Sequence, residues 1–172
     1  MSTLPVQISE NAPHPQAAHH PFAEDAYSVT VRGESSGFAQ QVTARTHCFT
    51  SDEPISMGGG DTGPSPYDLL LAALGSCTSM TISMYARRKN WPLNDVVVRL
   101  RHWKQRPLSG DEAAPIPPPV DIIEREITLN GNLDDQQQAR ILEIADRCPV
   151  HRTLSAKMEI RTQSAVTNPP LP

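Results

Sequence analysis

The segment from Pro66 to about Lys89 constrains the fold most, because it carries the strongest helix signals in the chain. Ser65 is a suitable N-cap, Pro66 suits the first helical position, and Asp68 places a negative charge in the first turn, where the helix dipole favours it. Residues at spacings of three and four predict one buried face, made of Leu70, Ala73, Leu74, Cys77, Met80, Thr81 and Met84. The fold should therefore be built on one long helix with Cys77 in its middle.

Segments with a period of two flank this helix and predict strands. Three of them precede it, at residues 27–32, 38–45 and 47–50, and two follow it, at 96–104 and 122–129. The first two read as a hairpin because the turn residues GESSG separate them.

The last third of the chain predicts two more helices and a final strand. A helix should begin at Asp134 or Asp135 and run to about Arg147, and a short helix should follow with Cys148 as its N-cap and Pro149 at its first position. A strand is expected at 157–162. The order β-β-β-α-β-β-α-α-β is that of an α+β domain, in which we expect a long antiparallel sheet wrapped on the central helix.

Length and proline positions predict one domain with tails. A chain of 172 residues suits a single domain. Most of its prolines lie near the two ends and in one internal stretch, which are positions typical of tails and loops. We expect a disordered tail at 1–25, one domain at 26–163 with a proline-rich loop at 105–121, and a second disordered tail at 164–172.

Charge and hydropathy indicate a cytoplasmic protein without nucleic-acid or membrane partners. The net charge is −4, and no run of Lys or Arg suggests a surface that follows phosphates. No segment approaches 18 consecutive apolar residues, and the first 16 residues lack the pattern of a signal peptide. Three widely spaced cysteines, Cys48, Cys77 and Cys148, do not suit a disulfide-stapled secreted domain, so we expect free thiols.

The cysteines are the candidate reactive groups, although each also suits a packing role. A thiol with a pKa of about 8.5 is mostly protonated at neutral pH, so a mid-helix Cys77 would need a cation beside it. Backbone N–H groups would stabilise a Cys148 thiolate if this residue caps the short helix. The helix dipole would destabilise the thiolate if Cys148 instead ends the preceding helix. Cys48 has no motif around it and is interpreted as structural. Cys148 and His151 supply two ligands, fewer than a zinc site needs, so we expect no metal.

Two segments resemble the paired cysteine motifs of the OsmC/Ohr family, whose names refer to osmotic induction and organic hydroperoxide resistance. These segments are GPSPYDLLLAALGSC, which ends at Cys77, and ADRCPVH, which contains Cys148. The resemblance extends over residues 29–162 in element order. The stretch around the first motif is most similar to a bacterial branch of the family that is functionally less well defined than the two namesake groups.

The resemblance implies a thiol-dependent peroxidase. Cys77 would attack an organic hydroperoxide and become a sulfenic acid, and Cys148 would resolve it as an intramolecular disulfide. The resemblance also implies an intertwined homodimer with active sites at the subunit interface. A dithiol reductant, such as a lipoylated protein, would reset the disulfide, and no metal or organic cofactor is implied.

The chain departs from the family pattern at Tyr67. In the namesake groups a Glu occupies this position and pairs with an Arg from the N-terminal strands. Asp68 is one residue further on and about 100° around the helix, so it does not simply inherit the role. We expect Glu53 or Asp68 to substitute for the Glu, and Arg32, ahead of Arg45, to supply the cation; Arg152 is a further candidate.

Two other functions stay open at this point. The same fold and thiols could serve a redox sensor, which oxidises once without turnover, or a protein that binds an apolar ligand along Leu70, Leu74, Met80 and Met84. In the peroxidase these four residues would instead form a pocket that prefers alkyl peroxides. A purely structural role for both thiols predicts that mild oxidant forms no bond between them.

Overall fold

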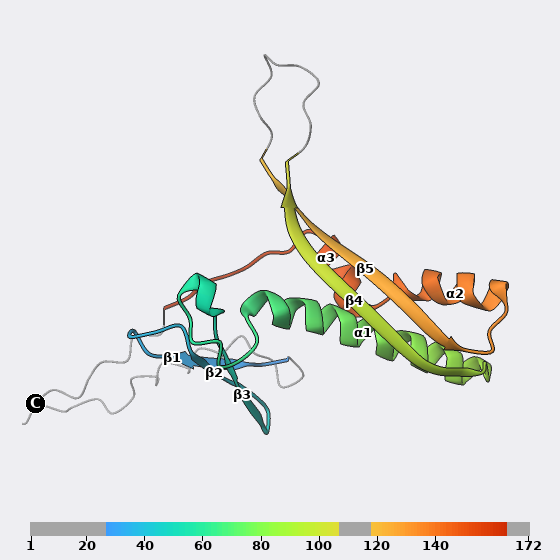
Figure 1. Cartoon of the computed structure of the whole chain (residues 1–172), viewed down its shortest axis with the longest axis horizontal. Coiled ribbons are helices and arrows are strands. Elements are labelled where there is room, and N and C mark those ends of the chain that lie inside the picture. The colour runs from blue at the N-terminus through green and yellow to red at the C-terminus, as the bar shows by residue number, and fades with distance from the viewer. Residues whose placement is uncertain (1–26, 107–117, 165–172) are drawn as a thin grey trace, which may run out of the picture.

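The computed structural model describes residues 27–106 and 118–164. In this part of the chain, two antiparallel sheets and three α-helices follow one another (Figure 1). The elements are β1 (Thr30–Gly33), β2 (Gln40–Ala44), β3 (His47–Ser51), a 3-10 turn (Ile55–Met57), α1 (Pro66–Lys89), β4 (Leu93–Gln105), β5 (Val120–Gly131), α2 (Asp135–Ala145) and α3 (Pro149–Ser155). The α+β class is confirmed.

Helix α1 begins and ends where the sequence signals predict. The Ser65 hydroxyl accepts a hydrogen bond from the Asp68 backbone N–H, and the Asp68 carboxylate accepts one from the Ser65 backbone N–H, which together form a capping box. The helix ends before Asn90, which adopts the left-handed conformation that closes many helices. Local signals at both ends therefore determine this element.

The buried face of α1 differs from the predicted one. Its buried residues are Leu74, Gly75, Thr78, Ile82, Tyr85 and Ala86. Met80 and Met84, expected in the buried stripe, are exposed, and Leu70 and Cys77 lie at its half-buried margin. The reason is that β4 packs on the helix along the line of Gly75, where a Cβ atom would lie 2.8 Å from Leu100 Cδ1. The predicted buried stripe is therefore wrong in this chain, and the apolar pocket stays a prediction.

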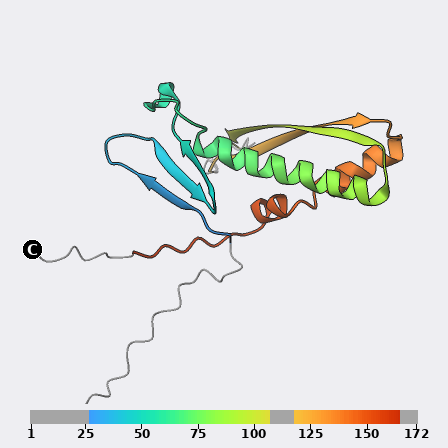
Figure 2. The same cartoon turned by 90° about the horizontal axis from the view of Figure 1, so that it is seen from below.

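Strands β4 and β5 form a long ribbon that covers α1. Leu100 pairs with Arg125, so these two side chains share a face of the ribbon, whereas the next pair, Arg101 and Glu124, lies on the other face. The ribbon and α3 lie on different sides of α1 (Figure 2). Both strands run into the expected loop 105–121, and residues 107–117 of that loop lie outside the described residues.

A compact core joins α1, α2 and the ribbon. Ile82, Leu133, Ile141 and Ala145 form its buried cluster, and Trp91 and apolar side chains of β4 and β5 pack against it. Asp134 caps α2 with its side chain, in a second capping box with Gln137. The buried cluster holds α2 against α1. The turn from Asp146 to Cys148 follows α2 and therefore lies beside the middle of α1.

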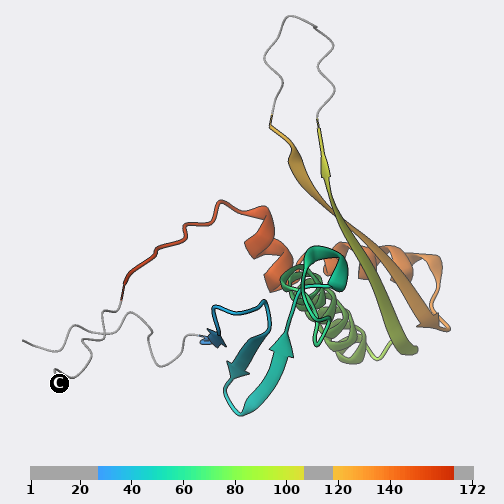
Figure 3. The same ribbon diagram turned by 60° about the vertical axis from the view of Figure 1, so that its left-hand side comes forward.

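The N-terminal strands form a separate sheet. Strand β2 pairs with β1 and with β3, and the main contacts of these strands are with one another (Figures 1 and 3). The predicted single long sheet is therefore wrong for this protomer. No pairing joins β3 to β4 in the described chain, because the loop 52–64 and α1 separate them.

The predicted last strand is also wrong. Residues 157–164 are exposed and form no strand among the described residues, because no sheet edge of the described chain pairs with them. Most of the two predicted tails lies outside the described residues, since 1–26 and 165–172 are not described. The domain bounds therefore stay a prediction.

A buried carboxylate organises the loop that leads into α1. The Asp52 side chain accepts hydrogen bonds from the backbone N–H groups of Glu53, Gly60 and Thr62 and from the Thr62 hydroxyl. Burial raises the pKa of Asp52, but these hydrogen bonds outweigh it and lower the pKa below its ordinary value. Gly59 must be glycine here, because a Cβ atom would lie 1.8 Å from the Glu53 carbonyl oxygen.

Helix α1 is long and apolar enough to span a bilayer by length and composition, with a mean hydropathy of 1.4 over its most apolar window. The core helix of a soluble protein passes the same test. In this protein α1 packs against β4, α2 and α3.

Candidate functional site

The structure brings Cys77 and Cys148 together. Cys77 lies in the middle of α1 and is partly exposed. Cys148 is fully buried and is the N-cap of α3, with Pro149 at the first helical position, as the sequence predicts. The two thiols lie close enough for each to shift the pKa of the other. Residues 71 positions apart in sequence therefore form one dithiol site.

The surroundings shift the pKa values of the two thiols in opposite directions. Burial raises the pKa of Cys148, but hydrogen bonds from the Cys77 thiol, the backbone N–H groups of Val150 and His151 and the Thr78 hydroxyl lower it below the ordinary value. Burial raises the pKa of Cys77, and so does the hydrogen bond that its thiol donates to Cys148.

The two sulfur atoms differ in their access to solvent. Cys77 is the sulfur that a solute can reach, since Cys148 is fully buried in this chain. A buried thiol beside a partly exposed thiol is suited to formation of a disulfide. In forming it, the two thiols would together give up two electrons and two protons.

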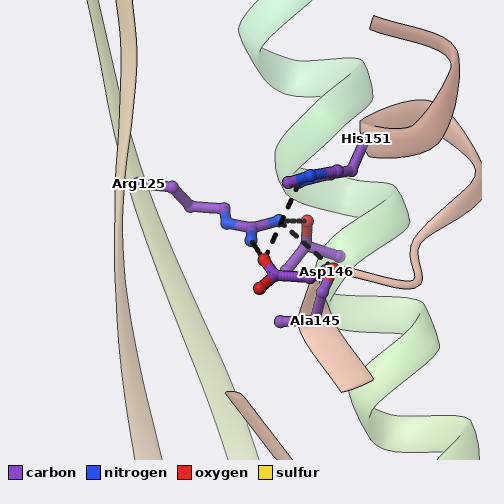
Figure 4. A network of polar contacts seen from close by, with 5 residues as sticks. Arg125, Ala145, Asp146 and His151 are labelled. Carbon is purple, nitrogen blue, oxygen red and sulfur yellow. Dashed lines mark hydrogen bonds and ion pairs between the residues drawn. The ribbon is translucent and has the colours of Figure 1, made fainter. Parts of the chain in front are cut away.

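A polar network surrounds the buried side of the site (Figure 4). Arg125 of β5 forms an ion pair with Asp146, at 2.7 Å between Nη2 and Oδ1. His151 of α3 lies near the same oxygen, at 3.9 Å between Nδ1 and Oδ1. The network joins β5, the end of α2 and the start of α3 around Cys148.

The other predicted site residues lie apart from the thiols in this chain. Arg32 is an exposed residue of β1 that pairs with Gln41. Glu53 follows β3, where its backbone carbonyl accepts a hydrogen bond from Asp61 N–H. The Asp68 side chain caps α1, and its hydrogen bonds with Ser65 hold the pKa of Asp68 below its ordinary value. Nine residues of helix separate Asp68 from Cys77, which is roughly 13 Å.

The remaining sequence candidates also have clear positions. Tyr67 stacks on His102 of β4, with ring centroids 4.5 Å apart. Cys48, interpreted from the sequence as structural, is exposed on β3, where Gln41 donates a hydrogen bond to its sulfur. Among the residues that the structure describes, no three His, Cys, Asp or Glu side chains gather as a metal site, so Cys148 and His151 have no third ligand there.

Sequence reasoning missed Arg125, Thr78 and Asp146. One signal was available for the first of them. Strand β5 alternates half-buried and exposed residues, and Arg125 stands between Ile123 and Ile127 at an inward position. A charged residue on the apolar side of an alternating strand is rarely buried without a partner.

Comparison with known structures agrees with the fold. The structure of a protein from Psychrobacter arcticus superimposes with a TM-score of 0.59, at 21% identity, over 77% of this chain and 90% of that one. An OsmC-like protein from Mycoplasma pneumoniae gives 0.57 at 18% identity, over 77% and 89% of the chains. The organic hydroperoxide resistance protein OsmC from Legionella pneumophila gives 0.56 at 16% identity, over 78% and 92%.

In this α+β fold, two cysteines that are distant in sequence lie in a long helix and at the start of a short one. The sequence model of the OsmC-like protein family matches residues 58–163, which is more than half of the chain. The chain therefore belongs to the OsmC-like protein family. No curated protein sequence matches it.

Proposed function

We propose that this protein is a thiol-dependent organic hydroperoxide reductase with a two-cysteine mechanism. The observation that carries the proposal is the contact between a partly exposed Cys77 and a buried Cys148. In the proposed reaction Cys77 sulfur attacks the peroxide O–O bond, forms a sulfenic acid and releases an alcohol. Cys148 sulfur then attacks Cys77 sulfur, so that the S–S bond forms, the S–O bond breaks and water leaves.

The proposed cycle needs an external dithiol to restore both thiols. Family membership and neighbours named for organic hydroperoxide resistance support the choice of substrate class. A lipoylated protein is the reductant that the family resemblance implies, and thiol–disulfide exchange from its two sulfurs would return Cys77 and Cys148 to their reduced forms. We place this reaction in the cytoplasm, where such dithiols are kept reduced.

A homodimer is part of the proposal. Phe38, Phe49, Met80 and Met84 are exposed in the single chain, although large apolar side chains gain from burial. A second copy that covers them would also bring its own N-terminal sheet near α1. Arg32, with Glu53 to orient it, would then approach the thiols of the other subunit.

Steady-state turnover separates the reductase from a redox sensor. Purified protein is supplied with excess cumene hydroperoxide or hydrogen peroxide and with a lipoyl or a thioredoxin-type donor. We expect consumption of many equivalents of cumene hydroperoxide per dithiol, with slower use of hydrogen peroxide. Oxidation that stops at one equivalent in the presence of both donors would instead identify a sensor.

The proposed role of Arg32 predicts a pH effect on Cys77. A guanidinium near a thiolate stabilises the charged form, so Arg32→Met should raise the apparent pKa of Cys77 alkylation, measured with Cys48 and Cys148 replaced by serine. Arg45→Met is the matched variant, because Arg45 follows β2 and is the second candidate. If neither substitution moves the apparent pKa upward, the N-terminal sheet does not activate Cys77.

A further inference from the structure

Arg125 occupies a position where a charged side chain needs a specific reason. It reaches α1 from the inner side of β5, and its side chain is only 13% exposed. A guanidinium has five N–H donors and no acceptor, so burial is costly unless those donors find partners. The neighbouring arginines Arg99 and Arg101 of β4 are largely exposed instead. What Arg125 contacts therefore explains its position.

The guanidinium of Arg125 connects two segments that are far apart in sequence. Nη1 donates to Thr78 Oγ1 of α1 at 2.8 Å and to the carbonyl oxygen of Ala145, the last residue of α2, at 3.3 Å. Nη2 donates to Asp146 Oδ1 at 2.7 Å, in the turn after α2 (Figure 4). One side chain of β5 thus ties the middle of α1 to the end of α2.

Each end of this connection lies beside one of the cysteines in the chain. Thr78 follows Cys77 directly on α1 and is fully buried. The Ala145 carbonyl oxygen that accepts a hydrogen bond from Arg125 also accepts one from the Cys148 backbone N–H, at 3.3 Å. Arg125 and the backbone of Cys148 therefore share one acceptor. The guanidinium links this backbone to the turn of α1 that carries Cys77.

Apolar packing alone does not determine where this turn lies. The buried cluster that joins α1 to α2 includes Ile82, Ile141 and Ala145, and the next residue, Asp146, has an exposed side chain. Burial of apolar surface has no preferred direction, so it leaves open how the chain continues after Ala145. Hydrogen bonds from a charged fork are directional and strong. The three bonds of Arg125 therefore direct the chain from α2 toward Cys148.

We propose that Arg125 is a positioning residue that ties the turn before Cys148 to the residue after Cys77 and thereby keeps the two thiols in the arrangement that a disulfide between them requires. A disulfide needs Cα atoms within about 7 Å of each other, so a free turn would lower the effective concentration of one thiol at the other. This deepens the proposed function and, for its catalytic consequence, rests on it. Because Arg125 acts through the turn, it needs no contact with peroxide or reductant.

The step that Arg125 would favour can be measured without peroxide. Lipoamide, a cyclic disulfide, takes two electrons and two protons from Cys77 and Cys148. Its S–S bond breaks to give dihydrolipoamide, and an S–S bond forms between the two cysteines. The reverse reaction is the reset by a dithiol in the proposed cycle. The equilibrium constant of this exchange reports how strongly the folded protein favours its own disulfide.

The test measures this equilibrium constant in the full chain with Cys48→Ser, so that only the two site cysteines remain. Protein is equilibrated with lipoamide and dihydrolipoamide at a series of ratios at pH 7 and quenched with acid, and its free thiols are alkylated and counted by mass spectrometry. We expect Arg125→Met to lower the equilibrium constant for the protein disulfide about tenfold, which corresponds to about 30 mV, because bonds from a charged group no longer hold the turn.

Two further substitutions separate position from charge. Arg125→Lys keeps a positive charge, but an ammonium does not reproduce the planar fork to Thr78 and Asp146, so the equilibrium constant should fall in this variant too. Thr78→Val removes the α1 end of the connection and should act in the same direction, whereas Thr78→Ser keeps the hydroxyl and should retain the unmodified value. A substitution that weakens the fold equally in both redox states leaves the equilibrium constant unchanged, so a fall is specific to the disulfide.

Arg101→Met is the matched control. It removes an arginine from the opposite face of the same ribbon, where Arg101 pairs with Glu124, so the equilibrium constant should stay unchanged. Circular dichroism establishes that each reduced variant is folded, and Arg125→Lys carries the test if Arg125→Met is not. An unchanged equilibrium constant in the folded Arg125 variants would overturn the proposal. So would a normal value in Arg125→Lys beside a low one in Arg125→Met, because charge alone would then be responsible.

Failure of the proposed function is seen separately. If the unmodified protein shows no peroxide turnover while the Arg125 and Thr78 variants lower the equilibrium constant, the positioning role stands and the peroxidase does not. If turnover is normal and no variant changes the equilibrium constant, the opposite holds.

Discussion

Replacing Cys77 by serine is expected to abolish peroxide consumption, whereas replacing Cys148 by serine should leave a single turnover that ends in a trapped Cys77 sulfenic acid. The reason is that attack precedes resolution, and only a second thiol can displace the sulfenic oxygen. A sulfenic-acid-specific probe with mass spectrometry measures the trapped product, and a peroxide assay measures the turnover. Both variants retain a hydroxyl at the site, so packing is little changed.

Cys48→Ser is the control for this pair of variants. Cys48 is exposed on β3 and is hydrogen-bonded to Gln41, in a different sheet from the dithiol. Its loss should leave peroxide consumption unchanged. If the first oxidation step is lost equally in Cys77→Ser and Cys148→Ser, the assigned order of the two cysteines is wrong.

A large effect on stability is expected from truncation of the core between α1 and α2. Ile141→Ala removes a fully buried side chain and should lower the free energy of unfolding by about 2–5 kcal/mol. Leu142→Ala is the matched control, because Leu142 is the next residue of the same helix and its exposed fraction is 49%. It should cost less than about 1 kcal/mol. Urea denaturation at one fixed protein concentration measures both values.

The stability of the Ile141→Ala variant also tests how α2 supports the thiol site. Ile141 holds α2 against α1, and the end of α2 leads directly into Asp146 and Cys148. Equal losses in Ile141→Ala and Leu142→Ala would mean that α2 does not pack as described. The thiol contact would then lack the support that we assign to it.

Elements with signals at their own ends could be predicted from the sequence. Both long helices carry capping boxes, and Cys148-Pro149 marks the start of α3, so their positions depend on neighbours within a few residues. The cysteine pair could also be predicted, because its two motifs resemble those of a known family. These features need no knowledge of distant contacts.

Features that depend on distant contacts could not be predicted. The position of β4 determines which face of α1 is buried. Thr78 and Ile82 are therefore buried, whereas Met80 and Met84, which were expected in the buried stripe, are exposed. A strand at 157–162 requires a sheet edge to pair with, and the described chain offers it none. Arg125 reaches Thr78 across 47 positions of sequence, which no local pattern encodes.

The separation of the two sheets has a consequence for local stability. Strands β1, β2 and β3 contact mainly one another, whereas α1 is packed against β4, α2 and α3. Native proteins open locally first where few buried contacts hold a segment, so the N-terminal sheet should exchange its amide hydrogens before the thiol-bearing core does. In a dimer that covers this sheet, its protection would rise with protein concentration by mass action. Dilution would then destabilise the N-terminal sheet, which carries Arg32, while the core that contains the two thiols stays folded.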